Sequence, residues 1–288
     1  MITEKDINTS INYDSILSEH RINTAIEVPK PPTILSIKNV GISFSREIRM
    51  FTLGNFSAIK GKMKSKKTFL LSLLTSSIMR GSDFNDYFKG ELPEDKKIIV
   101  YIDTEQGEWD SWNCISRIER MAGTKDNFMA FNLRPFSPSE RCEIIEFIFN
   151  KYKERIALMI IDGIADLVSA LNDELEATRV TSMLLKYTAL YNNHVSVVIH
   201  ENKANDYATG HIGSAVLKKA EIIISVTKCK NIPDSSDVVC DYSRGYGFEP
   251  FVMTINEHGY PYVNGNAKAT AKKEKTFYEE EIKDEVPF

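Results

Sequence analysis

The stretch that decides the fold reads Ser57-Ala-Ile-Lys-Gly-Lys-Met-Lys-Ser-Lys-Lys-Thr-Phe-Leu-Leu71. A short apolar run at residues 56–59 leads into Gly61, and a lysine-rich loop follows it. Lys67 and Thr68 then open a segment whose apolar residues have helical spacing. A strand, a loop and a helix that starts with Lys-Thr indicate a phosphate-binding loop, in which backbone N–H groups and the helix N-terminus hold phosphate oxygens.

The loop departs from the Walker A pattern Gly-x-x-x-x-Gly-Lys-Ser/Thr at one position, because Lys66 stands where the pattern has its second glycine. Glycine lets the backbone approach phosphates closely without a Cβ in the way. We therefore expect a backbone conformation that lysine tolerates, with the Lys66 side chain pointing outward. The alternative is a basic surface turn that binds no phosphate, and the other motifs decide between the two.

The composition fits one large domain with appendages. Its 288 residues are 42% hydrophobic, which is enough for a substantial core, and the net charge of −4 requires any nucleic-acid-binding surface to be local. The four cysteines lack the paired spacing of a zinc site. No stretch approaches the ~20 apolar residues that span a bilayer. We expect a soluble cytoplasmic protein with reduced thiols and no membrane partner.

Strand-like and helical segments alternate over residues 33–263, the predicted domain. The predicted strands cover residues 56–60, 97–103, 127–133, 156–162, 194–200 and 221–227. The predicted helices cover residues 67–80, 109–121, 138–152, 174–191 and 214–219. Continuous apolar runs such as 158–161 are typical of strands buried on both faces of a parallel sheet. The pattern predicts an α/β fold with a mostly parallel sheet, helices on both faces, and antiparallel edge strands at residues 237–242 and 251–255.

Both ends of the chain are predicted to be appendages. Residues 1–32 are polar and end in Pro29-Lys-Pro-Pro32, which indicates an arm or linker with one short helix near residues 13–20. Residues 264–288 are rich in lysine and glutamate and lack periodicity, which indicates a disordered acidic tail.

Three polar residues follow predicted strands. Asp162 ends the strand at 156–162, where a carboxylate and the Thr68 hydroxyl can organise Mg²⁺, although such an Asp is often only a helix cap. Glu105 follows the strand at 97–103 and is the candidate for activating water, with Asp103 as back-up; the alternative is two solvated acids. His200 ends the strand at 194–200 and can touch a terminal phosphate, unless it is structural.

The ordered set Gly61…Lys67-Thr68, Ile102-Asp-Thr-Glu105, Ile160-Ile-Asp162 and Ile199-His-Glu-Asn202 resembles the RecA-like ATPase core. Within it, the chain is most similar to the plasmid and mobile-element branch related to hexameric replicative helicases. The resemblance implies ATP and Mg²⁺ as cofactors, Lys67, Glu105 and His200 in catalysis, and Thr68 and Asp162 at the metal. It also implies a homo-oligomer, ring or filament, with nucleotide between neighbours. The implied nucleotide contacts are Gly61, Lys62, Met63, Lys64, Ser65, Lys66, Lys67, Thr68 and Phe69.

The same resemblance gives meaning to two loops and to one arginine. Residues 169–177 and 202–213 correspond to loops that contact DNA in RecA-like proteins, and the first is acidic here. The predicted contacts to single-stranded DNA are therefore in the second loop: Lys203, Asn205, Tyr207 and His211. Arg244 is preferred over Lys228 and Lys230 as the arginine finger that reaches a neighbouring subunit's nucleotide. The alternative is an ordinary solvated arginine.

The last residues, Glu279-Glu-Glu-Ile-Lys-Asp-Glu-Val-Pro-Phe288, resemble the acidic tip of bacterial single-stranded-DNA-binding proteins. Such tips dock a terminal Phe and its carboxylate on replication and repair proteins, so these are implied partners. The alternative is a solubilising tail that happens to end in Phe288.

The leading hypothesis is an ATP-hydrolysing, DNA-dependent enzyme of a plasmid, mobile element or phage, acting as helicase, translocase or loader in replication, mobilisation or recombination. The rival is a nucleotide-binding adaptor that hydrolyses little, a possibility that Lys66 keeps open, and recruits replication proteins through its tail. A third hypothesis is a RecA-like regulator with protein clients and no DNA.

Overall fold

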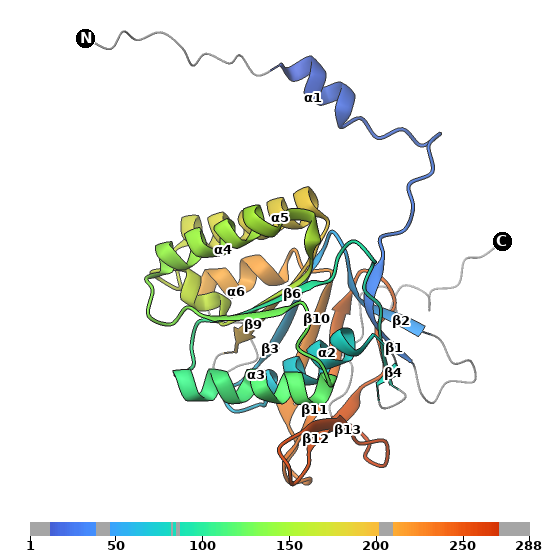
Figure 1. Ribbon diagram of the computed structural model, residues 1–288, viewed down its shortest axis with the longest axis vertical. Coiled ribbons are helices and arrows are strands. Elements are labelled where there is room, and N and C mark those ends of the chain that lie inside the picture. Colours follow the sequence, from blue (N-terminus) through green and yellow to red (C-terminus); the bar gives the residue numbers. More distant parts are fainter. Residues whose placement is uncertain (1–11, 39–46, 82, 85–86, 202–209, 271–288) are drawn as a thin grey trace, which may run out of the picture. The chain divides into compact units, whose positions relative to one another are not determined.

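The computed structural model describes residues 12–38, 47–81, 83–84, 87–201 and 210–270 (Figure 1). The chain divides into two compact units, Met1–Lys30 and Pro31–Phe288. In the first unit, the predicted short helix forms as α1 (Tyr13–Glu19). The Asn12 side chain caps it by accepting a hydrogen bond from the backbone N–H of Ser15, and none of its residues is buried.

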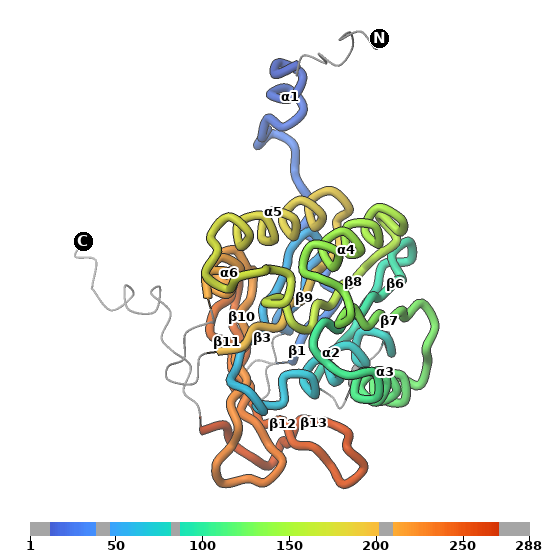
Figure 2. The backbone as a smooth tube through the Cα atoms, turned by 90° about the vertical axis from the view of Figure 1, so that its left-hand side faces the viewer, coloured from blue at the N-terminus to red at the C-terminus, as the bar shows by residue number. Residues whose placement is uncertain are grey.

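In the second unit, the described residues form a sheet of nine strands in the order β13-β12-β11-β10-β3-β9-β8-β6-β7. The strands are β3 (Phe56–Gly61), β6 (Ile98–Asp103), β7 (Phe128–Asn132), β8 (Ile156–Asp162), β9 (His194–His200), β10 (Ile222–Lys228), β11 (Ser235–Ser243), β12 (Phe251–Ile255) and β13 (Pro261–Val263). From β10 to β7 all neighbours are parallel, and from β10 to β13 all are antiparallel. Figure 2 shows β12 and β13 together at one end of this sheet.

Helices cover both faces of the sheet (Figures 1 and 2). α2 (Lys67–Arg80) and α3 (Glu108–Ala122) pack on one face, while α4 (Pro138–Tyr152), α5 (Glu174–Tyr191) and α6 (Gly210–Leu217) pack on the other. Successive strand residues face opposite sides, so Ile59 joins the core under α2 and Ala58 the core under α5. This arrangement confirms the predicted α/β fold with a mixed, mostly parallel sheet. Only the last helix was placed wrongly, because α6 begins at Gly210 and not at residue 214.

A second, smaller sheet was not predicted. It has the order β2-β1-β5-β4, with β1 (Thr33–Lys38), β2 (Glu47–Thr52), β4 (Asp83–Phe84) and β5 (Phe88–Gly90). β5 lies so close to α2 that a Cβ on Gly90 would come within 2.2 Å of the Ser77 carbonyl oxygen. α2 is thus enclosed by two sheets, which explains why its serines and threonine at positions 72 and 75–77 are as buried as its leucines.

The first residues after the predicted domain also bond to it. Asn264 donates its backbone N–H to the Val252 carbonyl, and Thr270 donates from both N–H and hydroxyl to Asp237. The chain therefore stays attached to the domain beyond residue 263, the boundary predicted from the sequence.

His194 ties the smaller sheet to the larger one. Its ring is fully buried and stacks on Phe51 of β2, with 4.5 Å between ring centroids. Its Nδ1 lies 2.8 Å from the Thr52 carbonyl oxygen and its Nε2 lies 2.9 Å from the Ser57 hydroxyl. A neutral ring satisfies both contacts, donating from Nδ1 and accepting at Nε2. Burial accordingly lowers the pKa of His194 to about 3.

The folded protein should lose stability in mild acid because of His194. The pKa of His194 in the folded state lies below its unfolded value of about 6.5. Below pH 6.5, His194 therefore binds a proton in the unfolded chain but stays neutral in the folded one. We expect this residue to lower the free energy of unfolding by about 1.4 kcal/mol per pH unit between pH 6 and 4. Urea unfolding of His194→Gln should show a shallower pH dependence, and exposed His258→Gln an unchanged one. An identical slope in His194→Gln would contradict this.

Candidate active site

The polar residues predicted at strand ends lie at one edge of the larger sheet, because the strands that carry them are neighbours there. In the register of the sheet, Gly61 pairs with His200 and Asp103 pairs with Asp162. A cavity of about 480 Å³ opens at this edge. It is lined by Lys64, Ser65, Lys66, Lys67, Thr68, Phe69, Glu105, Gln106, Asp110, Asn113, Cys114, Arg117, Asp162 and His200.

The loop between β3 and α2 has the shape of a phosphate-binding loop despite its lysines. A Cβ on Gly61 would lie 2.4 Å from the Val226 carbonyl oxygen, so only glycine fits there. Lys66 has φ 72° and ψ 30°, in the left-handed region that glycine favours. The expectation of a lysine-compatible backbone was therefore wrong: the loop keeps the glycine conformation and bears the strain. The side chain does not point outward either, since its Nζ lies 3.0 Å from Asp234 Oδ1 and the side chain is only 14% exposed.

Lys67 lies in the concave side of this loop. Its ammonium donates to the carbonyl oxygens of Gly61, at 2.8 Å, and Lys62, at 3.0 Å. Burial is the largest influence on it and lowers its pKa, against the attraction of Asp162 and Glu105. A buried ammonium held among oxygen acceptors is well suited to bind phosphate oxygens.

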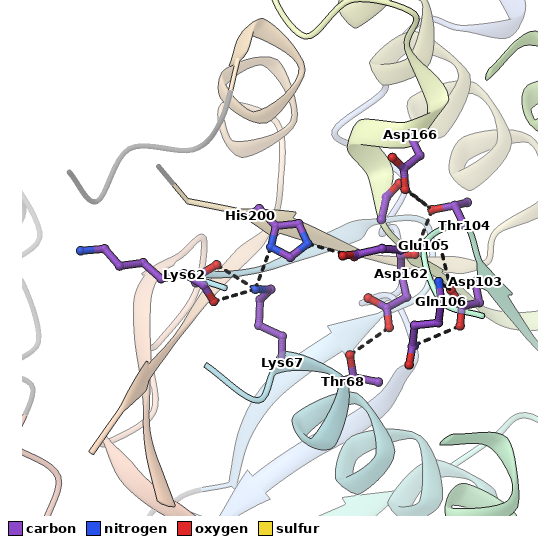
Figure 3. A network of polar contacts seen from close by, with 12 residues as sticks. Lys62, Lys67, Thr68, Asp103, Thr104, Glu105, Gln106, Asp162, Asp166 and His200 are labelled. Atoms are coloured by element: carbon purple, nitrogen blue, oxygen red, sulfur yellow. Dashed lines mark hydrogen bonds and ion pairs between the residues drawn. The ribbon is translucent and has the colours of Figure 1, made fainter. Parts of the chain in front are cut away.

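His200 connects Lys67 to Glu105 (Figure 3). Its Nδ1 lies 3.2 Å from the Lys67 Nζ, and its Nε2 lies 3.0 Å from Glu105 Oε2. A lysine ammonium can only donate, so Nδ1 accepts and Nε2–H donates to the carboxylate. This hydrogen bond from His200 is the main reason why the pKa of Glu105 lies below its usual range. The structure thus brings together all three residues that were predicted to be catalytic.

Asp162 is buried beside the helix N-terminus. One of its oxygens accepts hydrogen bonds from the Tyr101 hydroxyl, at 2.7 Å, and from the Thr68 hydroxyl, at 3.2 Å. Burial raises its pKa to about 6, more than these two donors lower it. The Tyr101 contact was not foreseen, because Tyr101 lies inside an apolar strand and its sequence neighbours give no signal.

Thr68 and Asp162 fit a magnesium site that is completed by phosphate and water oxygens. Mg²⁺ commonly takes one or two protein oxygens and keeps the rest of its octahedral shell for substrate phosphates and water. Asp162 is a buried carboxylate that no cationic side chain bonds within the described residues, so it has charge to offer a metal. Those residues contain no group of three or more His, Cys, Asp or Glu placed to hold a metal by themselves.

Asp103 has a different role from the back-up base that was considered for it. Its carboxylate accepts from the backbone N–H groups of Glu105 and Gln106, and from the Ser111 hydroxyl at 2.6 Å. It therefore shapes the turn that presents Glu105. Thr104 does similar work, because its hydroxyl contacts the Gly163 carbonyl and Asp166 and joins this turn to the end of β8.

One wall of the cavity was missed by the sequence analysis. α3 contributes Asp110, Asn113, Cys114 and Arg117, which recur at the spacing of one helix face. The Arg117 guanidinium lies 4.0 Å from the centre of the Phe69 ring and donates to the Ser72 hydroxyl. The signal was available, since the polar residues at positions 110, 113 and 117 are three and four residues apart and share one helix face, but only the helix itself was inferred.

Of the predicted DNA contacts and the finger, only His211 and Arg244 belong to the described residues, and neither lines this cavity. Lys203, Asn205, Tyr207 and Phe288 lie outside the described residues. His211 is exposed at the start of α6, where its backbone N–H donates to the Leu171 carbonyl. Arg244 contacts Asn55 Oδ1 and the Lys219 carbonyl oxygen, close to the amino end of β3 and therefore at the opposite edge of the sheet.

Comparison with known proteins finds similarity among solved structures only. No protein-family model matches the sequence, and no curated protein matches it. Among solved structures, the chain is similar to the crystal structure of the RadB recombinase, with a TM-score of 0.48 and 17% sequence identity; the match covers 73% of this chain and 91% of that chain. Within the described residues, no helix has both the length and the apolar character needed to cross a bilayer.

Asp162→Asn should separate stability from metal binding. Because the neutral amide removes a buried charge, we expect the free energy of unfolding without ligand at pH 8 to rise, on the order of 1–3 kcal/mol. The same change should abolish the Mg²⁺ dependence of nucleotide binding, measured by titrating a fluorescent ATP analogue with and without Mg²⁺. Exposed Asp126→Asn is the matched control and should alter neither. A less stable Asp162→Asn protein with an intact Mg²⁺ response would refute this assignment.

Proposed function

We propose that this chain is a Mg²⁺-dependent ATPase of the RecA-like kind that acts on single-stranded DNA in replication, mobilisation or recombination of a plasmid, mobile element or phage. One observation carries the proposal: Lys67, Thr68, Glu105, Asp162 and His200, from four separate strand ends, line a single cavity. A phosphate loop, a metal-binding pair, a carboxylate and a contacting histidine are the groups that phosphoryl transfer to water requires.

The roles follow from the contacts. The N-terminus of α2 and the Lys67 ammonium bind the phosphate chain of ATP. Thr68 and Asp162 would hold Mg²⁺, which would supply positive charge to the phosphate oxygens when bound. Glu105, at the rim of the cavity and aimed by the Asp103 turn, orients a water molecule and accepts its proton. His200 lies between Lys67 and Glu105, and so links phosphate binding to the state of this carboxylate.

Contact with DNA is proposed for the segments that follow β8 and β9. Leu171, after β8, accepts a hydrogen bond from the N–H of His211, so these two segments meet. The end of β9 is held firmly, because Glu201 pairs with Lys60 of β3 at 3.0 Å and Lys60 also pairs with Asp241 at 2.8 Å. A shift of His200 on nucleotide binding would therefore act directly on the segment that begins at residue 202. A homo-oligomer, as ring or filament, would bring such segments from several subunits together.

The adaptor remains a second candidate, and one observation favours it. Glu105 is engaged by His200, which lowers its pKa and makes it a weaker base. A site that binds ATP tightly and turns it over slowly would suit a protein that recruits replication or repair proteins through its tail at Phe288.

Steady-state ATP hydrolysis with and without single-stranded DNA tests the proposal. We expect hydrolysis that rises with DNA, with Lys67→Ala losing ATP binding and Glu105→Gln keeping binding while its kcat falls about 10²–10⁴-fold. Glu108→Gln, an exposed acid outside the cavity, is the control and should hydrolyse ATP like the unmodified protein. ATP binding without turnover, unaffected by DNA, would favour the adaptor. No ATP binding at all would refute both.

Arg244 provides a test of assembly. Since it lies away from the cavity of its own chain, a catalytic role for it requires a neighbouring subunit. We expect Arg244→Ala to bind ATP normally and to hydrolyse it at least 10-fold more slowly. Mixing Arg244→Ala with Lys67→Ala subunits should restore part of the activity, because some interfaces then combine an intact Lys67 with an intact Arg244. An inactive mixture that still forms mixed oligomers would exclude action in trans.

A further inference from the structure

Two lysines of the phosphate loop are held in a backbone conformation that lysine disfavours. Lys64 has φ 63° and Lys66 has φ 72°, and both residues line the cavity. Side chains with a Cβ are strained in this region, whereas glycine is not. At position 66 the Walker A pattern has glycine, so glycine would serve the shape of the loop better than the residue that is present.

The Lys66 side chain forms an ion pair with an exposed partner. Its Nζ lies 3.0 Å from Asp234 Oδ1, in the turn between β10 and β11. The Asp234 side chain is 77% exposed, and an ion pair with such a partner contributes little because water solvates it almost as well. The turn itself is anchored, since the Ser236 hydroxyl donates to the Ser65 carbonyl oxygen. The Lys66 ammonium is therefore held by an ion pair that contributes little to stability.

We propose that the Lys66 side chain is a second cationic ligand for the phosphate chain, which leaves Asp234 when a nucleoside triphosphate enters the cavity. The inference rests on the proposed function. It assigns a role to the Lys66 side chain, in addition to the phosphate contacts proposed for the loop backbone. A triphosphate with its several negative charges offers stronger, charge-assisted hydrogen bonds than one exposed carboxylate does. Lys66 would then favour the triphosphate over the diphosphate, which carries less charge.

Lys66→Gly tests this directly, because glycine suits the loop conformation and removes only the side chain. We expect it to bind ATP about 10-fold more weakly and ADP with a smaller loss, measured by calorimetry in the presence of Mg²⁺. Its melting temperature should be unchanged or higher, since strain is relieved. Lys153→Gly is the matched control: Lys153 also has a positive φ, of 46°, but is exposed before β8 at the other edge of the sheet. It should bind ATP like the unmodified protein.

Asp234→Asn tests the exchange. Because Lys66 then lacks its ionic partner, the Asp234→Asn protein should bind ATP about two- to three-fold more tightly. This gain in affinity should vanish in the Lys66→Gly background. ATP binding by Lys66→Gly that equals or exceeds that of the unmodified protein would overturn the inference, and an equal gain from Asp234→Asn in both backgrounds would overturn the exchange. Failure of the proposed function would look different, because the unmodified protein would then not bind ATP, or Lys67→Ala would bind it equally well.

Discussion

The buried carboxylate of Asp162 is the constraint on which the rest of the site depends. It lies at the end of β8, a strand with every residue buried, and within the described residues only the hydroxyls of Tyr101 and Thr68 bond it. Ionising it there costs free energy, as its raised pKa indicates. The surrounding core supplies the stability that offsets this cost. Functional sites commonly contain such groups, which lower the stability of the fold. A divalent cation between Asp162 and Thr68 would convert the cost into binding energy.

The sequence contained the parts of the site but not their arrangement. Continuous apolar runs correctly indicated buried parallel strands, and polar residues after those runs indicated one functional edge. The order of the strands came from elsewhere. β9 pairs with β3 although more than a hundred residues separate them, and this pairing alone brings His200 beside Lys67. Local periodicity says nothing about such pairing, because loop connections of similar length are compatible with several strand orders.

Other features escaped because their causes are tertiary. The small sheet of β1, β2, β4 and β5 uses strands of two to six residues and mixed polarity, and the apolar side chains of β1, β2 and β5 pack into the same core as those of α2. Lys66 was expected to change the loop, yet the loop keeps the glycine conformation, with two close contacts just before Lys66: Gly61 against Val226 and Ser65 against Ser236. In both cases, contacts between segments that are distant in the sequence outweighed the local conformational preference of the residues.

The chain of contacts from Lys67 through His200 to Glu105 makes ligand binding and carboxylate chemistry dependent on each other. His200 can accept from Lys67 at Nδ1 only in the tautomer that donates from Nε2 to Glu105. An anion that draws the Lys67 ammonium toward itself would weaken the contact at Nδ1, and a turn of the imidazole toward the anion would take Nε2 away from Glu105. Glu105 would lose its hydrogen bond in that step, and with it the cause of its lowered pKa. Glu105 would then become a stronger base only after phosphate has bound. Proton transfer from water would in this way be confined to the state with substrate in place.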